Sequence, residues 1–429
     1  MRMQLNCHRS IRRALATATA SLIGASPLQA AGAGHSETSV LLYSERDRIR
    51  ATEIVYSLQR SLNNGDRLSL RLTYDGLTGA SPTGGSPSKQ AQTVTRPSGG
   101  STVVVPAGQI PRDENFSDTR FAAQFGLARR LSLNTEAMVG ISGSSEHDYK
   151  SLGLNGGLVF DFHDLKSSIG VAGSFSHDSY NPNGGVPTAY APTDTVMDND
   201  NGRLLGNGAR PKDQYDLALS YSKVMSTRTL ARWNLSINHA EGYLTDPYKQ
   251  ISVVQPIDSA DAGEPVGHLF EKRPNRRTGI AGAFDLRSHV AGTIAQTGYR
   301  YYRDDWGVQS HTADLSVKLQ LSATKSLEPR ARWYRQSRAD FSRPFLVQGQ
   351  PRPEYASADA RLATFTAFTY GLAYSFPSGK QSSLTFSAEY YLQSGDQSPP
   401  EAFGPLTTFS LFPNIRALML RVSLGHDII

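Results

Sequence analysis

The side chains that could support catalysis are scattered along the 429-residue chain, and only one local cluster combines the right types. Ser310 and His311 follow Asp304 and Asp305 closely. A hydrolase needs a Ser or Thr nucleophile, a His base and an orienting acid. No nucleophile elbow surrounds Ser310, and the other histidines fall in separate loops and strand ends. A solvated polar loop is the simpler interpretation of the cluster, so we predict that the protein is not an enzyme.

Metal and nucleotide chemistry have equally little support in the sequence. The acidic, Asn-containing run at residues 194–201 offers oxygen ligands for Ca²⁺, yet it lacks the spacing and the closing Glu of an EF-hand. A flexible acidic loop is the simpler interpretation. No Gly-rich phosphate loop follows a strand and opens a helix. The single cysteine, Cys7, lies in a segment that we expect to be removed, which excludes disulfides and a Cys nucleophile. We expect neither a metal nor a cofactor.

The N-terminus is typical of an export signal, with a disordered basic tail as the alternative. Four arginines precede a modestly apolar segment, Ala14 to Ala25, and small residues around Ala30 offer a cleavage site. We therefore expect a signal peptide over residues 1–30 and a single domain over residues 31–429. The formal net charge of +6 includes those four arginines, which leaves about +2 and no argument for nucleic acid.

Strict alternation of apolar and polar residues predicts the elements that position these side chains. From Thr312 to Leu321 the apolar residues fall on one face and the polar residues on the other, which is the period of a β-strand. About ten residues at about 3.3 Å each, tilted by about 40°, span about 25 Å, the height of the apolar band of an outer-membrane barrel. No run approaches the roughly eighteen apolar residues of a spanning helix. We infer strands with an apolar face toward lipid and an Arg-rich face toward a lumen.

Repetition of this pattern predicts an all-β, transmembrane, antiparallel up-and-down β-barrel of about sixteen strands. Short turns alternate with long loops, as expected for short periplasmic turns and long extracellular loops. The first strand is expected at Val40 to Ser44, followed by a tight turn over Glu45 to Arg48. The insert from Leu77 to Ser117 is rich in Gly, Pro, Ser and Thr, so we expect a mobile loop without a core. Six aromatic residues near strand ends are expected to form an interfacial girdle: Tyr299, Tyr301, Trp306, Trp333, Tyr374 and Tyr390.

The expected lumen face carries both charge signs, with a small excess of cations. Arg and Asp or Glu on facing strands could simply pair and brace the wall. Alternatively, the wall forms a slightly cationic conduit for polar or anionic solutes, wide enough for water at this strand number. The basic set is Arg71, Arg120, Arg232, Arg287, Arg300, Lys318, Arg330, Arg332 and Arg421, and the acidic set is Glu53, Glu136, Asp161, Asp216, Asp285, Asp314 and Glu389.

Six short stretches together resemble a family of predicted Gram-negative outer-membrane barrels, the domain-of-unknown-function family 3570. They are Leu42 to Arg48, Leu244 to Lys249, Tyr299 to Gly307, Ser310 to Thr312, Arg332 to Phe341 and Glu389 to Tyr391. The resemblance implies a barrel in the outer membrane but no established activity. It singles out Asp246, Pro247, Tyr248, Asp304, Asp305 and Trp306 as family-like loop residues. Such proteins are often encoded near a small lipoprotein, a thioredoxin-like protein and a flavin-attaching enzyme, which implies an envelope redox or maturation system as context.

These observations favour passage or binding of a small polar solute across the outer membrane. The alternative is a structural or interaction barrel that holds an envelope lipoprotein or a redox or maturation system. No plug domain precedes the first expected strand, which argues against an energy-coupled transporter. The partners we expect are outer-membrane lipid, the barrel assembly machinery and an envelope lipoprotein, with no nucleic acid.

Overall fold

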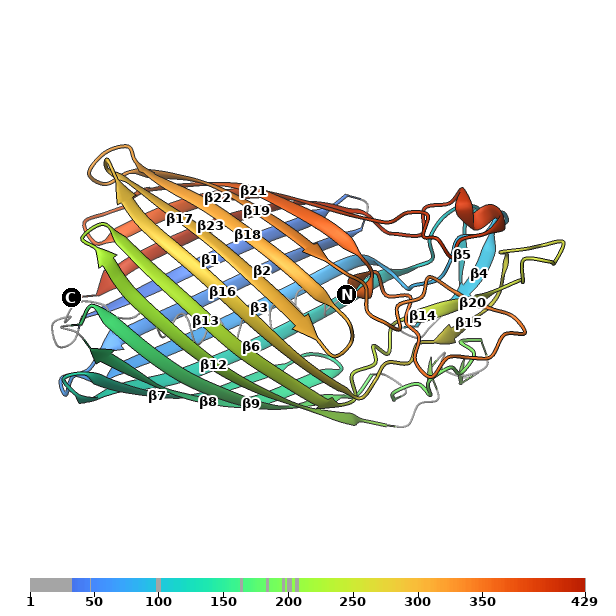
Figure 1. Ribbon diagram of the computed structural model, residues 1–429, viewed down its shortest axis with the longest axis horizontal. Coiled ribbons are helices and arrows are strands. Elements are labelled where there is room, and N and C mark those ends of the chain that lie inside the picture. Colours follow the sequence, from blue (N-terminus) through green and yellow to red (C-terminus); the bar gives the residue numbers. More distant parts are fainter. Residues whose placement is uncertain are drawn as a thin grey trace.

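Sixteen antiparallel strands close into a single barrel in the computed structural model (Figure 1). The structure describes residues 33–46, 48–97, 102–162, 165–182, 185–194, 197–198, 203–204 and 208–428. The expected signal peptide lies outside these residues. The barrel strands are β1 (Gly34–Glu45), β2 (Ile49–Ser61), β3 (Arg67–Pro82), β6 (Arg112–Ser132), β7 (Thr135–Ser145), β8 (Tyr149–Phe162), β9 (Ser167–Tyr180), β12 (Arg210–Ser226), β13 (Thr229–Gly242), β16 (Arg276–Val290), β17 (Thr293–Asp304), β18 (Gln309–Gln320), β19 (Ser326–Gln336), β21 (Phe365–Pro377), β22 (Ser382–Gly395) and β23 (Ile415–Ile428).

Closure depends on the pairing of the first strand with the last. β1 pairs with β23 from Gly34 opposite Ile428 to Glu45 opposite Ala417, so the barrel sheet has no free edge. Each barrel strand hydrogen-bonds to its neighbours in chain order. The predicted all-β antiparallel barrel of about sixteen strands is therefore confirmed.

The outward face of the barrel is apolar and exposed. Leu315 on β18 and Phe368 on β21 are 47% and 41% exposed, and similar side chains recur around the barrel. Monomeric soluble proteins rarely expose a continuous apolar patch larger than a few hundred Å². In a membrane barrel, the same face contacts hydrocarbon and is buried there. The alternation thus produces a barrel of the outer-membrane type.

None of the helices in the described part of the chain is both long and apolar enough to span a membrane.

The two ends of the barrel differ in the length of their connections. At the turn end, two-residue turns join β6 to β7, β12 to β13 and β16 to β17. Ala291 and Gly292 have φ angles of 48° and 79°, the positive pair that a tight hairpin turn of the primed type requires. At the loop end, long connections follow β3, β9, β13, β19 and β22. The described chain begins and finishes at the turn end, where Gly34 and Ile428 are paired.

The long connections fold into a cap at the loop end, on the right of Figure 1. We define the cap as residues 83–97, 102–111, 243–275, 337–364 and 396–414. It contains the hairpin of β4 (Gln92–Thr95) and β5 (Thr102–Val105), and a sheet of β15 (Pro265–Phe270), β14 (Gln250–Val254) and β20 (Leu346–Val347). Two short 3₁₀ helices, η1 (Ala360–Leu362) and η2 (Gly404–Thr407), complete it. A further short pair, β10 (Met197–Asp198) and β11 (Arg203–Leu204), lies outside the cap as defined.

The structure corrects three local expectations. The first strand begins at Gly34 instead of Val40, because residues 34–39 pair on both sides with β2 and β23. The insert from Leu77 to Ser117 is no coreless loop in its described part, since Val94 and Val105 are 2% and 5% exposed within the cap. Trp306 is 4% exposed and packs against Phe341, so it belongs to a buried cluster and not to an interfacial girdle.

A matched pair of substitutions tests which face contacts lipid. Leu217, on β12, is 54% exposed on the apolar face, and the adjacent Ala218 faces the lumen between the small residues Ala172 and Ser236. Leu217→Arg should lower the free energy of unfolding by about 2–4 kcal/mol, the cost of a charge at the bilayer midplane. Ala218→Arg should change it by much less. Urea unfolding in lipid vesicles, followed by tryptophan fluorescence, measures both, and equal destabilisation would contradict the assignment of faces.

Candidate functional site

Several of the charged residues expected in the lumen form ion pairs across neighbouring strands. Arg332 lies opposite Asp314, and its Nε is 2.5 Å from the Oδ1 atom of that residue. Arg330 contacts Glu328 at 2.8 Å and Glu389 at 3.4 Å. The alternation places all of these on the face opposite the exposed apolar side chains. The wall is therefore braced in part by its own charges.

Other charged groups of the wall are paired or constrained nearer the rims. Buried Arg120 is ion-paired with Asp75 and lies 3.9 Å from Glu146. The guanidinium of Arg300 lies 5.4 Å from the centre of the Tyr302 ring. Arg232 lies opposite Asp285 in the register between β13 and β16, without an ion pair between them.

A second group of cations on the same face has no such partner. Arg71, Arg287 and Arg421 are exposed, and none of them forms an ion pair with any residue that the structure describes. Lys318 likewise makes no ion pair within the described chain. Arg71 lies between Ser57 of β2 and Gln124 of β6, and Arg421 lies opposite Ser387 of β22. These neighbours are polar but uncharged, so the positive charge of the guanidinium groups is not neutralised locally.

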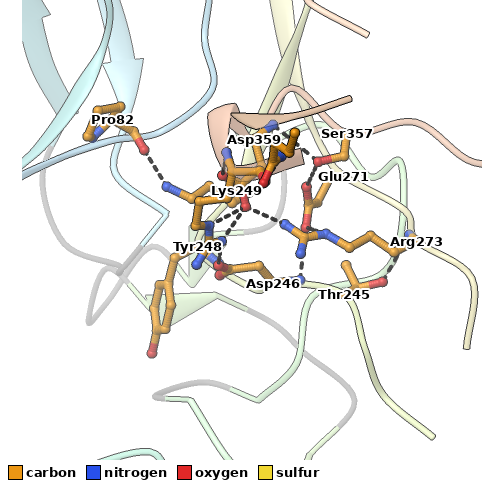
Figure 2. A network of polar contacts seen from close by, with 11 residues as sticks. Pro82, Thr245, Asp246, Tyr248, Lys249, Glu271, Arg273, Ser357 and Asp359 are labelled. Carbon is orange, nitrogen blue, oxygen red and sulfur yellow. Dashed lines mark hydrogen bonds and ion pairs between the residues drawn. The ribbon is translucent and has the colours of Figure 1, made fainter. Parts of the chain in front are cut away.

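The family-like residues of the third long loop lie at the centre of a polar network in the cap (Figure 2). Asp246 is buried, and its Oδ1 accepts a hydrogen bond of 2.9 Å from the amide of Tyr248, two residues along the chain. Pro247, between them, presets the backbone for this side-chain turn. The amide of Asp246 in turn donates to Oε1 of Glu271 at 2.9 Å, and its carboxylate is ion-paired with Arg361. The turn thereby places a carboxylate inside the cap.

Three acids and three bases alternate through this network. Arg273 lies between Glu271, at 2.6 Å, and Asp359, at 2.7 Å. Arg361 bridges Asp359 and Asp246. Lys249 donates from Nζ to the carbonyl oxygen of Pro82 at 2.5 Å, at the end of β3. With all six side chains ionised, the network is neutral, which offsets the cost of burying each charge.

The network joins segments that are distant in the sequence. The hydroxyl of Tyr248 donates to Asp148, in the turn between β7 and β8. The hydroxyl of Ser357 donates to Glu271. The amide of Gln250 donates to the carbonyl oxygen of Thr83 at 2.8 Å. Segments adjoining β3, β7, β13 and β19 are therefore held in one arrangement at the loop end.

Burial and pairing shift the pKa values of the network acids in opposite directions. Burial alone would raise the pKa of Asp359, but Arg361, Arg273 and Lys249 outweigh it and hold that pKa well below its usual range. The pKa of Asp246 is lowered in the same way, against the effect of burial, chiefly by Arg361. Burial raises the pKa of Glu271, and Arg273 offsets this only in part. Asp246 and Asp359 are therefore held ionised within this network.

The second family-like motif forms the turn between β17 and β18. The carboxylate of Asp304 accepts hydrogen bonds from Arg277, from the hydroxyl of Tyr302 and from the amides of Trp306 and Val308. Trp306 donates from Nε1 to the carbonyl oxygen of Arg276 at 2.7 Å, and the guanidinium of Arg277 lies 4.5 Å from the indole centre. The carboxylate of Asp305 accepts from the amide of Thr278. These contacts fix the end of the hairpin and leave Asp304 fully engaged.

The structure does not assemble the Ser310 and His311 cluster into a nucleophile and base. The two residues are adjacent in β18, so their side chains point to opposite faces of the sheet. Ser310 is buried, and the Nδ1 of His311 is 2.7 Å from the hydroxyl of Tyr299 on the outward face. Within the described residues, no group of three or more His, Cys, Asp or Glu side chains is placed to bind a metal. The acidic run at residues 194–201 lies partly outside the described chain.

Sequence reasoning missed the partners of Asp246. Lys249, Glu271, Arg273, Ser357, Asp359 and Arg361 were not among the candidate residues, although they are buried or nearly so. Their only local signal is an acid and an arginine two residues apart, at Glu271 and Arg273 and again at Asp359 and Arg361. Such pairs are common on solvated loops, and their convergence is visible only in the fold.

A family model described as "Protein of unknown function (DUF3570)" matches residues 12–425 of the chain. The chain belongs to the DUF3570 family. No curated protein matches this DUF3570 sequence.

Solved structures similar to this DUF3570 protein are outer-membrane proteins of low sequence identity. A mutant of the ferric enterobactin receptor PfeA from Pseudomonas aeruginosa is 12% identical, with a TM-score of 0.43 over 92% of this chain and 60% of that chain. OccK5 (OpdH) from the same organism is 11% identical, with a TM-score of 0.42 over 94% of this chain and 100% of that one. A bacterial polysaccharide outer membrane secretin is 8% identical, with a TM-score of 0.44 over 94% and 100%. The DUF3570 chain spans about 60% of the length of the PfeA chain, and at TM-scores below 0.5 these likenesses support no inference about activity.

The pKa values of the buried acids Asp359 and Glu271 shift in opposite directions, so replacing each carboxylate with an uncharged amide should have different effects. Asp359→Asn removes a firmly ionised partner of Arg273 and Arg361, which should destabilise the cap by about 3–5 kcal/mol at neutral pH. Glu271→Gln should cost clearly less, because the pKa of Glu271 is raised and its ionisation opposes folding. Limited trypsinolysis of the folded barrel reports cap opening, and unchanged heat-modifiability on gels shows that the barrel persists. Equal sensitivity of the two variants would contradict the assignment.

The same shifts set the pH range over which the cap stays closed. A carboxylate with a lowered folded-state pKa stabilises the fold above its unfolded pKa, about 3.9 for Asp, and loses this contribution as pH falls through the folded value. Asp246 and Asp359 should therefore hold the cap closed from neutral pH down to about 4, with opening only in stronger acid. Amide hydrogen exchange of cap segments across this range measures it, and opening between pH 6 and 5 would contradict it.

Proposed function

We propose that this barrel provides passage or binding for a small polar solute across the outer membrane, with a preference for anions. The observation that carries the proposal is the set of exposed lumen-face arginines without a partner, Arg71, Arg287 and Arg421. A guanidinium group is strongly disfavoured in a dry interior unless it is paired. Its exposure on the inner face therefore favours a lumen that holds water.

The pairing pattern of the wall supports the anion preference. The acids Asp314 and Glu389 are already engaged by arginines, and Glu136 is engaged by Arg67. Asp161, Asp216 and Asp285 of the same face likewise form no ion pair within the described residues, and the nine basic residues of the expected lumen set exceed its seven acids by two, which gives the wall a small positive excess. A narrow passage with low-dielectric walls and one excess sign of charge concentrates counter-ions and raises their entry rate. Small carboxylates and phosphates fit this chemistry.

The cap supplies selectivity in this proposal. Its buried network fixes the segments beyond β3, β13 and β19 in one arrangement, so a solute entering from the loop end meets an ordered surface instead of mobile loops. Ordered loops discriminate between solutes because little conformational entropy is lost on contact.

A second candidate is an interaction barrel that holds an envelope partner such as a lipoprotein. The observation in its favour is that the ordered cap exposes large apolar side chains, with Val104 at 66%, Ile257 at 73% and Val266 at 45% exposed. Scattered exposed apolar residues are common on protein surfaces, so this support is weaker than that from the lumen.

Ion selectivity in planar bilayers tests the first candidate. In a KCl gradient the reconstituted protein should show steady conductance with chloride preferred over potassium. The variant Arg71→Ser/Arg287→Ser/Arg421→Ser should lower the chloride-to-potassium permeability ratio severalfold, because it removes the unpaired lumen charge.

The matched control is the variant Arg228→Ser/Lys325→Ser/Lys380→Ser, which removes three exposed basic residues from the short connections at the turn end of the barrel. Its permeability ratio should stay at the wild-type value. Conductance with the same ion preference in all three proteins would remove the lumen arginines from the pathway. A silent barrel that co-purifies with an envelope protein would favour the interaction barrel.

A further inference from the structure

Three arginines lie on the outward face near the loop end, on three of the four consecutive strands β16 to β19. Arg303 is on β17, Arg335 is on β19, and Arg276 begins β16. Alternation places Arg303 on the face of Tyr299, which is 47% exposed, and Arg335 on the face of Trp333, which lies opposite the 41% exposed Phe368 of β21. These arginines therefore point away from the lumen. We call the set Arg276, Arg303 and Arg335 the outer arginine patch.

The rings of Tyr301 and His311 lie between the two central arginines of the patch, Arg303 and Arg335. Arg335 lies opposite His311, and His311 lies opposite Tyr301. The His311 ring is 5.1 Å from the Tyr301 ring, and its Nδ1 is 2.7 Å from the hydroxyl of Tyr299. Arg303 follows two residues after Tyr301 on the same face. Since β17 and β19 are separated by one strand, their axes lie about 10 Å apart, so one anionic headgroup can reach both side chains.

The charges of the patch are largely free of internal compensation. Arg303 and Arg335 are exposed, and neither forms an ion pair with a residue of the described chain. The side chain of Arg276 is 73% exposed and reaches Glu241 only at 4.0 Å. The carboxylate of Asp305 accepts the amide hydrogen of Thr278, and together with Glu241 it sets two negative charges against the three positive ones. The patch therefore presents a net positive charge.

The height of the patch places it at the headgroups of a bilayer. Arg335 lies two residues beyond Trp333 and Arg303 four residues beyond Tyr299, which is about 7 and 13 Å along the strands. With a strand tilt of about 40°, the arginine backbones rise about 5 and 10 Å above these belt residues. The polar layer of a bilayer is about 5–8 Å thick on each side of the hydrocarbon. A soluble partner could reach this surface only by displacing lipid.

We propose that the outer arginine patch binds the phosphate groups of a phosphorylated lipid in the outer leaflet. Arginine binds phosphate through paired N–H donors, and its planar group keeps this geometry while the acyl chains lie against the apolar belt below. The loop end of such barrels faces the outside of the cell, so the lipid concerned is that of the outer leaflet. This site is separate from the lumen, and its existence does not depend on solute passage.

The test compares lipid binding by two triple variants. The purified barrel is titrated in zwitterionic detergent with bisphosphorylated lipid A, and bound lipid is counted by native mass spectrometry. Arg276→Ser/Arg303→Ser/Arg335→Ser should weaken the apparent affinity by roughly a hundredfold, from about 1 kcal/mol for each basic residue near a membrane surface. The turn-end control Arg228→Ser/Lys325→Ser/Lys380→Ser removes the same charge and should bind as the wild type does. Equal loss in both variants, or in neither, would overturn the proposal.

Two further binding experiments identify the chemical group that the outer arginine patch binds. Lipid A stripped of both phosphates should bind the wild type no better than it binds the patch variant, because only the acyl chains remain. Millimolar inorganic phosphate should leave the bound lipid in place, and its displacement would assign the patch to soluble phosphate instead. The variant Arg276→Lys/Arg303→Lys/Arg335→Lys, which keeps the charge, should bind with intermediate affinity. Unchanged heat-modifiability of every variant shows that the barrel itself is intact.

Discussion

The pairing of backbone amide and carbonyl groups in the wall is the constraint on which the structure depends. Hydrocarbon offers no hydrogen-bond partner, so an unpaired backbone group at membrane depth costs several kcal/mol. A sheet satisfies this requirement only when its first and last strands meet, and the ladder between β1 and β23 does so over the whole of β1 and from residue 417 to residue 428 of β23. The polar residues 34–39 are therefore strand although their side chains show no amphipathic pattern. In this segment, the need to close the barrel decides the secondary structure, and the local composition does not.

Once the backbone is satisfied, the period of two divides the side chains between two environments. Lipid accepts only the apolar set, so that face is simple and easily recognised. The inner face accepts both paired and unpaired charges, and the structure contains both. Arg330 and Arg332 are the most obvious inner arginines in the sequence, yet both are ion-paired, whereas Arg71, Arg287 and Arg421 are not. The sequence alone does not distinguish the paired arginines of this face from the unpaired ones.

The sequence predicts the barrel well because barrel contacts are periodic and mostly between consecutive strands. The strand number, the faces and the alternation of short and long connections all follow from patterns within about 25 residues. The cap follows from no such pattern. Asp246 and Arg361 are 115 residues apart, and Glu271 and Ser357 are 86 residues apart. The Gly, Ser and Pro content of residues 77–117 is typical of a mobile loop, and burial of Val94 and Val105 becomes favourable only when other loops supply the remaining surface.

The charges inside the cap are better understood as a device for specificity than as a source of stability. Buried ion pairs contribute little net stability compared with apolar packing, but removal of one member leaves a buried charge without a partner. The network is neutral only when the segments carrying Asp246, Glu271 and Asp359 are all in place with their bases. Those segments adjoin β13, β16, β19 and β21, which belong to one continuous run of the sheet, and Lys249 contacts the end of β3, which is distant from this run in the strand order. Cap assembly therefore depends on the strands already being in place, because a partial cap would hold unpaired charges that water solvates better.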